Sequence, residues 1–228
     1  MSSNISNAIN NLQLHITNDL QSDTSISSVF AGIIGDQPSK YAKSPSLWRA
    51  SFNDLGIDAS YLAFDVTLEN LKGLVDVLRH EPTYLGGNVT VPHKIAVMDL
   101  LDDIDPLAKQ IGAVNTIVRQ QDGRLIGYNT DANGLIASLL QPTQWQQEPF
   151  ISSLFKKKIL LIGAGGAAKA AAFAAANEIG PEGRLYIANR SAESAESLAK
   201  GVNAVYGNAI FMPEDSISDV LPELDLVI

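Results

Sequence analysis

The sequence predicts an α/β protein with two domains, and three features support that prediction. Apolar runs of strand length alternate with helical segments from about residue 28 onward, which is typical of βαβ units and mainly parallel sheets. A polar loop with two prolines, QPTQWQQEPFISSLFKK, separates two such series. In the second series, a glycine-rich turn follows an apolar strand and opens an alanine-rich helix.

Composition narrows the class of protein. The 228 residues suffice for two domains with separate cores, and 46% apolar and 18% charged residues are typical of a globular protein. A net charge of −9 argues against nucleic acid or a membrane surface as a partner, but it allows a small anionic ligand. The absence of cysteine excludes disulfides, thiolate metal sites and cysteine nucleophiles. The N-terminus lacks the basic and apolar regions of a signal peptide, so we expect a cytoplasmic protein.

The first domain is expected to follow a short N-terminal arm. Residues 1–27 are rich in Ser, Asn, Asp and Gln with apolar residues at near-helical spacing, which predicts a weakly amphipathic helix in a partly mobile polar arm. Residues 28–133 then alternate between strands and helices and form the expected first domain. The expected elements are VFAGIIG, SLWRASFNDLG, SYLAFDV, LENLKGLVDVLR, LGGNVTV and HKIAVMDLL. Ser46 is the expected N-cap of the first helix among these, and Gly56 is its expected end.

A hairpin and a connecting helix lead to the second domain. Two short strands surround QDG, the composition of a hairpin turn. The helix ANGLIASLL, capped by Thr130 or Asp131, is the expected connector, with the division near residues 131–134. The second domain, residues 134–228, continues through KKKILLIGAGGAAKAAAFAAANEIG, RLYIANRS, AESAESLAKGV, NAIFMPED and ELDLVI. Because its last strand has no cover, we expect this domain to be incomplete at Ile228 and a natural chain to continue.

The glycine-rich turn predicts a dinucleotide site. ILLIGAGGAAKAA places Gly163, Gly165 and Ala168 in a G-x-G-x-x-A frame between a strand and a helix. The first glycine permits the tight turn, the second leaves room for a pyrophosphate, and the alanine lets helix and strand pack closely. The alternative is a glycine turn in an ordinary α/β domain. A membrane span is disfavoured because the stretch carries Lys169 and reads as a strand followed by a helix.

The end of the next strand indicates which cofactor binds. An NAD site usually places Asp or Glu there, whereas a 2′-phosphate is bound by Arg and hydroxyl donors. IANRS places Asn189, Arg190 and Ser191 at this position and no carboxylate. This favours NADP and leaves NAD open, the alternative for Arg190 being a solvated side chain at a strand end.

A dehydrogenase also needs a group that exchanges a proton with the substrate oxygen. His15 and His80 read as surface residues, and His93 reads as polar filler at a helix start rather than as a proton donor. Three scattered histidines give no metal-ligand spacing, so no metal is expected. Lys94 is better placed, because it follows the carboxyl end of a strand, where open α/β sheets bind ligands.

Two other loops place polar groups at comparable strand ends. AVNT carries Asn115 and Thr116, and YNTD carries Asn129, Thr130 and Asp131. If these loops converge on the lysine, Asp131 can hold it by a charge-assisted hydrogen bond while the asparagines orient substrate hydroxyls. Spacing alone leaves that convergence open.

Four blocks in order and spacing resemble the signature blocks of the shikimate dehydrogenase family: GGNVTVPHK, GAVNT, GYNTD and LLIGAGGA. The resemblance runs from about residue 29 to the end. It implies an N-terminal substrate domain, a Rossmann cofactor domain, and an NADP- or NAD-linked enzyme of aromatic amino acid biosynthesis (the chorismate pathway) or of quinate use. The implied reaction is the reversible reduction of 3-dehydroshikimate to shikimate, a small cyclic hydroxy acid. A homodimer is left open.

The resemblance also implies roles for individual residues. Lys94 and Asp131 would be the catalytic pair, with the lysine relaying a proton and stabilising the developing alkoxide. The residues expected to contact the substrate are Ser44, Asn88, Thr90 and Asn115, to which we add Tyr61, whose alternative is a core position. The residues expected to hold the cofactor are Gly163, Ala164, Gly165, Gly166 and Ala167 at the pyrophosphate, and Asn189, Arg190 and Ser191 at the ribose phosphate.

The first family block is altered in this chain. SKYAKSPSLW keeps Ser44 and Pro45 of the family's Ser-Xaa-Ser-Pro motif, but Ala42 stands at the first serine and Tyr41 precedes it. One hydrogen bond to the substrate carboxylate is then missing unless Tyr41 or Ser39 replaces it, and such a bond is worth about 1.5 to 3 kcal/mol. Two alternatives therefore stay open: a quinate/shikimate or aminoshikimate paralogue, and a ligand-sensing relative without turnover. The intact lysine and aspartate favour an enzyme.

Overall fold

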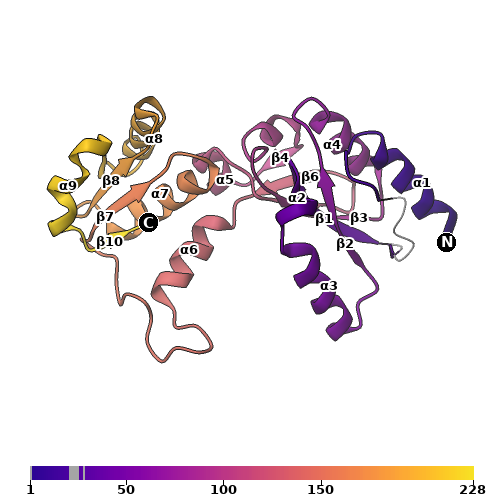
Figure 1. The fold of residues 1–228 in the computed structure, drawn as a ribbon, viewed down its shortest axis with the longest axis horizontal. Coiled ribbons are helices and arrows are strands. Elements are labelled where there is room, and N and C mark those ends of the chain that lie inside the picture. The colour runs from indigo at the N-terminus through magenta and orange to yellow at the C-terminus, as the bar shows by residue number, and fades with distance from the viewer. Residues whose placement is uncertain (1, 21–25, 28) are drawn as a thin grey trace. The chain divides into compact units, whose positions relative to one another are not determined.

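The computed structural model describes residues 2–20, 26–27 and 29–228, which form two compact units, Met1–Asn129 and Thr130–Ile228. Figure 1 shows both units as mixtures of helices and strands, so the predicted α/β class is confirmed. The boundary between the units lies just ahead of the division that the sequence placed near residues 131–134.

Unit 1 is built on a six-stranded sheet with the order β2-β1-β3-β5-β6-β4. Its strands are β1 (Phe30–Gly35), β2 (Ser60–Asp65), β3 (Tyr84–Val89), β4 (Asp103–Ile104), β5 (Thr116–Arg119) and β6 (Leu125–Tyr128). β1 pairs in parallel with β2 and β3, and β4 pairs in parallel with β6. β5 is antiparallel to both of its neighbours and forms with β6 the hairpin predicted around QDG.

The helices of unit 1 cover this sheet. They are α1 (Ser2–Gln13), α2 (Pro38–Tyr41), α3 (Ser44–Leu55), α4 (Leu71–His80) and α5 (Pro106–Ile111). α3 packs on β2 and β1, and α1 packs on α4 (Figure 1). Gly56 ends α3 in a left-handed conformation (φ 65°), as predicted. The predicted N-cap at Ser46 is wrong, because the helix already begins at Ser44 with Pro45 in its first turn, where proline fits well.

The segment after β3 also departs from the prediction. HKIAVMDLL reads as a helix, but residues 91–95 form a turn and only Ala96–Leu100 coil further, as a 3₁₀ helix. α5 follows soon after and was not predicted. Its N-cap Asp105 accepts hydrogen bonds from the backbone N–H groups of Leu107 and Ala108, which is a usual cap for a helix start.

Residues 2–20 of the predicted N-terminal arm instead contribute to the core of unit 1, and residues 1 and 21–25 of that arm lie outside the described residues. The arm's apolar residues lie in one buried cluster with the sheet and α4: Ile9, Leu12, Ile16 and Leu20. The chain then runs along β2, where Thr17 N donates to the Asp65 carbonyl oxygen (2.8 Å) and Asn18 Nδ2 donates to the Ala63 carbonyl oxygen (2.9 Å). Since β2 is the edge strand, these contacts satisfy backbone groups that would otherwise be open to another chain.

Unit 2 contains a four-stranded parallel sheet with the order β10-β7-β8-β9. Its strands are β7 (Lys158–Ile162), β8 (Arg184–Ala188), β9 (Ala209–Phe211) and β10 (Leu226–Val227). Its helices are α6 (Asp131–Leu140), α7 (Gly166–Ile179), α8 (Ala192–Asn203) and α9 (Ile217–Val220), with 3₁₀ turns at Glu214–Ser216 and Leu221–Glu223. Buried alanines line α7, which lets this helix pack close to β7 and β8.

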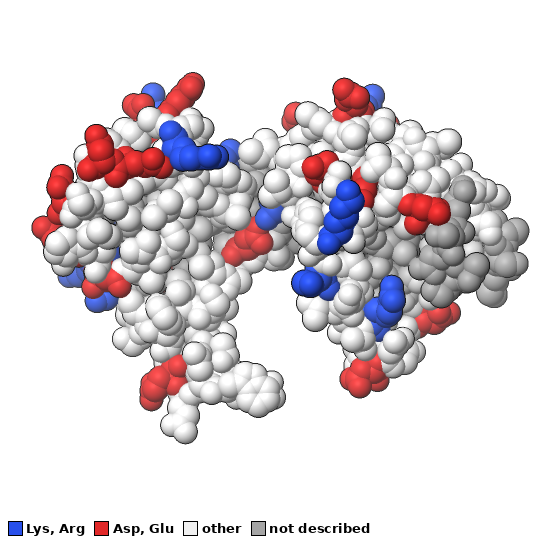
Figure 2. All heavy atoms as spheres, in the orientation of Figure 1, with Lys and Arg blue, Asp and Glu red and all other residues white. Residues whose placement is uncertain are grey.

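The surface carries mixed charge. On the face drawn in Figure 2, Lys and Arg side chains are scattered among acidic ones rather than gathered into one broad basic area. No helix within residues 2–20, 26–27 and 29–228 is long and apolar enough to cross a membrane.

Candidate active site

The polar blocks of unit 1 meet at one edge of its sheet. β1, β2 and β3 are parallel, so their carboxyl ends lie together, and the two antiparallel pairings bring the end of β6 to the same edge. The strand register shows which residues are neighbours there: Asn88 on β3 lies opposite Thr116 on β5, and Thr116 lies opposite Tyr128 on β6. Ligands of open α/β sheets bind at this kind of edge.

Asn88 is at the centre of a hydrogen-bond network on this edge. Its Oδ1 accepts a hydrogen bond of 2.5 Å from the Tyr61 hydroxyl, and its Nδ2 lies 3.5 Å from the Asn115 carbonyl oxygen. The Thr116 hydroxyl donates to Asn115 Oδ1 at 2.8 Å. Asn115 is buried, whereas Asn88 and Thr116 are half-buried and can present polar atoms to a small molecule.

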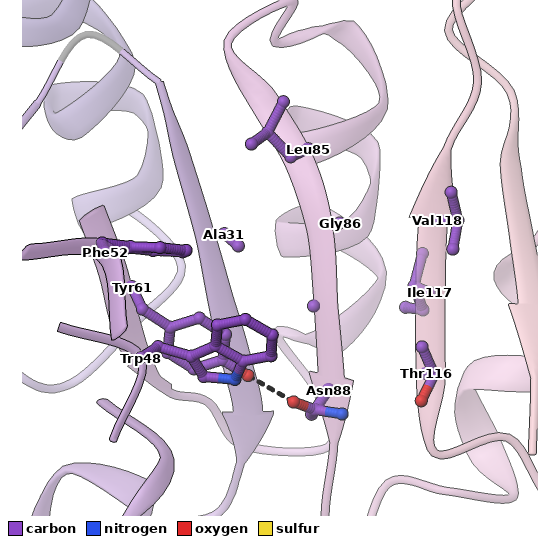
Figure 3. Close-up of a pocket in the computed structure, with 11 residues that line it drawn as sticks. Ala31, Trp48, Phe52, Tyr61, Leu85, Gly86, Asn88, Thr116, Ile117 and Val118 are labelled. Carbon is purple, nitrogen blue, oxygen red and sulfur yellow. Dashed lines mark hydrogen bonds between the residues drawn. The ribbon is translucent and has the colours of Figure 1, made fainter. Parts of the chain in front are cut away.

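Tyr61 is positioned by stacking as well as by Asn88. Its ring lies parallel to the Trp48 indole with centroids 5.8 Å apart, and Phe52 follows Trp48 one turn later on α3 (Figure 3). Burial raises the pKa of Tyr61 to about 12, and the nearby Ser44 side chain and the Asn88 backbone oppose this shift in part. The hydroxyl is therefore a neutral donor across the physiological range.

A groove of about 240 Å³ opens beside these side chains. Figure 3 shows Trp48, Phe52 and Tyr61 on one side of it and Leu85 and Val118 further along β3 and β5. Its walls are mainly apolar, with Asn88 and Thr116 as polar groups at one end. A polar end on an apolar groove is typical of sites for small organic ligands. Trp48 was not singled out from the sequence, although its four-residue spacing from Phe52 marks a shared face of α3.

The altered first block lies at the start of α3. The Ser44 Oγ is buried and makes no hydrogen bond of regular geometry to a described residue. The Ser44 side chain is still close enough to the Tyr61 hydroxyl to act on its pKa, in the direction opposite to burial. The Ser39 hydroxyl donates to the buried Asp65 carboxylate at 2.5 Å, and the Tyr41 side chain is 52% exposed. Ser39 therefore already has a structural partner, which argues against it as the replacement for a missing hydroxyl at Ala42.

Lys94 lies in the turn after β3 and is half-buried. Its carbonyl oxygen accepts a hydrogen bond from Val114 N (2.8 Å), which links this turn to the segment before β5. Thr90, at the start of the same turn, is tied to β1 by a hydrogen bond from its N–H to the Ile34 carbonyl oxygen (2.8 Å). The turn is thus held against two neighbouring segments of the sheet.

Asp131 begins α6 three residues after β6 ends. Ahead of it, the buried Asn129 donates from Nδ2 to the Ala113 carbonyl oxygen at 2.9 Å, which links YNTD to GAVNT. Thr130 precedes α6 without capping it through its side chain. Lys94 belongs to unit 1 and Asp131 to unit 2, so their pairing stays a prediction.

The glycine-rich turn of unit 2 has the backbone that a pyrophosphate site needs. Gly163 has φ 134°, a conformation that side chains disfavour, and its N–H donates to the Ala188 carbonyl oxygen at 2.7 Å. A Cβ built on Gly165 would meet nothing within 4 Å, so the backbone is open to a ligand. Gly166 begins α7, whose first amide groups are available to an anion. Ala164 lies in the glycine-rich turn and is half-buried, and Ala167 lies in the first turn of α7 and is exposed.

The predicted ribose-phosphate segment follows β8 directly. Asn189 Nδ2 donates to the Ser191 carbonyl oxygen (3.2 Å), and the Ser191 hydroxyl accepts from Ser194 N (3.3 Å) as the N-cap of α8. Arg190 between them is exposed. These residues, at the carboxyl end of a strand next to β7, suit an anionic group on a ribose. Among the described residues, no three His, Asp or Glu side chains are grouped to hold a metal ion.

Comparisons with known proteins bear on both units. A family model described as the shikimate dehydrogenase substrate binding domain matches residues 33–117, and one described as shikimate / quinate 5-dehydrogenase matches residues 146–228. The crystal structure of a shikimate dehydrogenase in complex with NADP⁺ aligns with a TM-score of 0.76 at 36% identity, covering 94% of this chain and 68% of that chain.

Two curated relatives are similar in sequence. The shikimate dehydrogenase (NADP(+)) of Shouchella clausii (strain KSM-K16) is 41% identical over 169 residues, which make up 74% of this chain and 57% of that protein. The protein of the same name from Methanocaldococcus jannaschii is 44% identical over 171 residues, or 75% of this chain and 55% of that protein. The chain thus spans somewhat more than half the length of these relatives.

Proposed function

The chain belongs to the shikimate dehydrogenase family, and from this membership we propose that it is an NADP-dependent dehydrogenase that reversibly reduces 3-dehydroshikimate to shikimate. The observation that carries the proposal is the strand register of unit 1, which gathers the polar blocks around Asn88 and Thr116 at one edge of the sheet. The dinucleotide turn at Gly163 supports the cofactor half of the proposal. Family membership also favours action in the cytoplasm.

The substrate would be held through its hydroxyls and its carboxylate. Asn88, Thr90 and Asn115 offer amide and hydroxyl groups to the substrate hydroxyls. The Tyr61 hydroxyl donates its one hydrogen to Asn88 Oδ1, so it orients the Asn88 amide and offers the substrate its oxygen as an acceptor. The buried Ser44 hydroxyl, which has no regular hydrogen bond to a described residue, suits the carboxylate. A site with few, well-directed polar groups orients a polyhydroxylated ring, which lowers the entropic barrier to reaction.

The cofactor would be held by unit 2. The open backbone at Gly165 and the start of α7 fit a pyrophosphate, and Arg190 with Ser191 fits a ribose 2′-phosphate. The curated relatives carry NADP(+) in their names, and the similar crystal structure is an NADP⁺ complex, which supports the same preference here.

In the proposed mechanism, Lys94 exchanges a proton with the substrate oxygen. When bound, NADPH supplies a hydride for the ketone carbon. The Lys94 ammonium donates a proton to the ketone oxygen, which becomes the new hydroxyl, and its charge stabilises negative charge that develops on that oxygen. Asp131 holds the ammonium by a charge-assisted hydrogen bond. In the reverse direction the same lysine accepts the proton.

A second candidate function is the oxidation of quinate or an aminoshikimate. Ala42 replaces a hydroxyl that relatives use for the substrate carboxylate, and Ser39 is engaged by Asp65. One hydrogen bond fewer to the substrate carboxylate lowers the affinity by about tenfold or more, which is enough to change the preferred ring acid. A ligand-sensing protein without turnover is a third reading of the same changes.

Steady-state assays separate these readings. Shikimate and quinate are each offered with NADP and with NAD to the wild type, to Lys94→Ala and to Lys72→Ala, which changes an exposed lysine of α4 as the control. We expect the highest kcat/KM with shikimate and NADP, a loss of about 10²- to 10⁴-fold in kcat for Lys94→Ala, and no change for Lys72→Ala.

The other outcomes are equally informative. Faster turnover of quinate than of shikimate would select the second candidate function. No reduction of either cofactor with either acid by the full-length protein would leave only the sensing protein. Equal kcat in Lys94→Ala and the wild type would remove the lysine from the mechanism.

A further inference from the structure

His93 lies directly between the cis proline of the turn after β3 and Lys94, and it is almost completely buried. Its side chain is 1% exposed. The imidazole Nε2 lies 2.8 Å from the carbonyl oxygen of Val66, at the end of β2. A carbonyl oxygen can only accept a hydrogen bond, so Nε2 carries the hydrogen. In the neutral ring Nδ1 then has none, and no described residue hydrogen-bonds to it.

This contact ties the turn to β2, a strand to which no backbone hydrogen bond of the turn runs in the described part of the chain. Backbone hydrogen bonds already link Thr90 N to β1 at the Ile34 carbonyl oxygen (2.8 Å) and the Lys94 carbonyl oxygen to Val114 N (2.8 Å). The imidazole adds a link to the end of β2 from the residue next to the lysine. Three segments at the carboxyl ends of the strands thus restrain residues 90–94, the turn that contains Lys94.

We propose that His93 is a positioning residue that holds the Lys94 turn through its Nε2–H···O=C bond to Val66. The inference rests on the proposed role of Lys94. With 1% of its side chain exposed, His93 is too enclosed to touch a substrate, so it acts through the residue that follows it. A displacement of about 1 Å in a catalytic group can cost on the order of 10²-fold in rate, so loss of this bond should reach kcat.

Three substitutions test the bond rather than the volume of the ring. His93→Gln places an amide Nε2 the same number of bonds from Cβ as the imidazole Nε2 and can still donate to Val66. His93→Asn places its amide where Nδ1 lies, and His93→Leu fills space without a donor. We expect kcat to fall by about tenfold to a hundredfold in the Asn and Leu variants and to stay within about threefold in the Gln variant.

Two further readouts separate positioning from loss of the fold. The KM for NADP should stay within about twofold in all three variants, because unit 2 is unchanged, and thermal unfolding should show a folded protein at the assay temperature. His93→Leu in a Lys94→Ala background should lower kcat no further, because residues that act through one another are not additive. The proposal would be overturned if His93→Leu kept the wild-type kcat while His93→Gln lost it. An additional loss of kcat in the double variant would also overturn it.

The wild-type protein supplies a test that does not depend on how the variants fold. A long-range ¹H–¹⁵N spectrum assigns the tautomer of His93, and we expect the proton on Nε2. A proton on Nδ1 alone would exclude the bond to Val66. Failure of the proposed function looks different: Lys94→Ala would keep its kcat. If Lys94→Ala loses activity and His93→Leu keeps it, only the positioning role fails.

Discussion

Asn88 shows how one residue of a β-strand can organise a site. Its position near the end of β3 places it opposite Thr116, and its side chain reaches Tyr61 on β2 and the backbone of Asn115 before β5. Three segments far apart in sequence, namely β2, β3 and residues 115–116, therefore contribute polar atoms to one network. Because the register of the sheet fixes these neighbours, the network is a property of strand pairing rather than of any local motif.

A second residue, Asp102, stabilises the fold of unit 1 and is not one of the candidate active-site residues. Its carboxylate accepts hydrogen bonds from Leu125 N (2.7 Å) and Arg79 Nε (3.1 Å), linking the segment before β4 to β6 and α4. The hydrogen bond from the Leu125 backbone is the largest cause of the lowered pKa of Asp102, followed by burial, which opposes it, and then Arg79. A lowered folded-state pKa stabilises the fold above the unfolded-state value of 3.8, and this stabilisation is lost as the pH falls through the folded-state pKa.

We expect Asp102→Asn to lower the free energy of unfolding at pH 7 by about 1 kcal/mol, a value discounted because the side chain is 31% exposed. The loss should shrink at pH 3, where the wild-type carboxylate is itself being protonated. Urea unfolding at both pH values measures this difference. Asp99→Asn, at an exposed carboxylate, is the control. A loss that is equally large at both pH values would show that the charge of Asp102 is not the cause.

At the scale of elements, α1 shows that the composition of a segment does not predict whether it packs into the core. The polar residues of the first 27 positions suggest an arm, but the few apolar ones are spaced to face α4 and the sheet, and they complete the core of unit 1. A helix needs only a narrow apolar stripe to be part of a core. The low overall hydrophobicity of a segment therefore says little about its packing.

Leu12→Ala tests the packing of α1. The Leu12 side chain is 0% exposed in the main cluster, so we expect a loss of about 2 to 5 kcal/mol in the free energy of unfolding. Leu14, two residues away and 77% exposed, is the matched control, and Leu14→Ala should change stability by less than about 0.5 kcal/mol. Chemical denaturation measures both. Equal effects of the two substitutions would contradict the assignment of α1 to the core.

At the scale of the whole molecule, the two units have different proposed roles. Unit 1 contains the proposed substrate contacts, and unit 2 contains the proposed cofactor contacts. Substitutions in one unit should therefore change the apparent affinity for one ligand and spare the other.

We expect Tyr61→Phe to raise the KM for shikimate by up to about tenfold, because the hydrogen bond to Asn88 is lost, with the KM for NADP unchanged. Arg190→Ala should do the reverse, raising the KM for NADP by about tenfold or more and reducing the preference for NADP over NAD. Full kinetics for both variants with both cofactors measure these effects. If Arg190→Ala kept the same ratio of NADP to NAD use, the assignment of Arg190 to the 2′-phosphate would be wrong.

Much of this organisation is readable from the sequence because it is local. Alternation of apolar runs predicts the strands, Gly56 predicts a helix end, and QDG predicts a hairpin, since each depends on residues a few positions apart. The order around Gly163 predicts a dinucleotide turn for the same reason. The 3₁₀ segment after Lys94 was missed, because HKIAVMDLL has a helical pattern that tertiary contacts override. The short helix α5 lies beyond that stretch and was also missed.

The sequence by itself determined the α/β class, the family and the residue types of the candidate site. Only the tertiary structure decided which of those residues are neighbours: that Tyr61 meets Asn88 beneath Trp48, that Asp65 engages Ser39, and that buried His93 bonds to Val66. The physical reason is the same in each case. These contacts join residues across strands or between a loop and a strand, and their geometry follows from sheet register and packing, which no short stretch of chain contains.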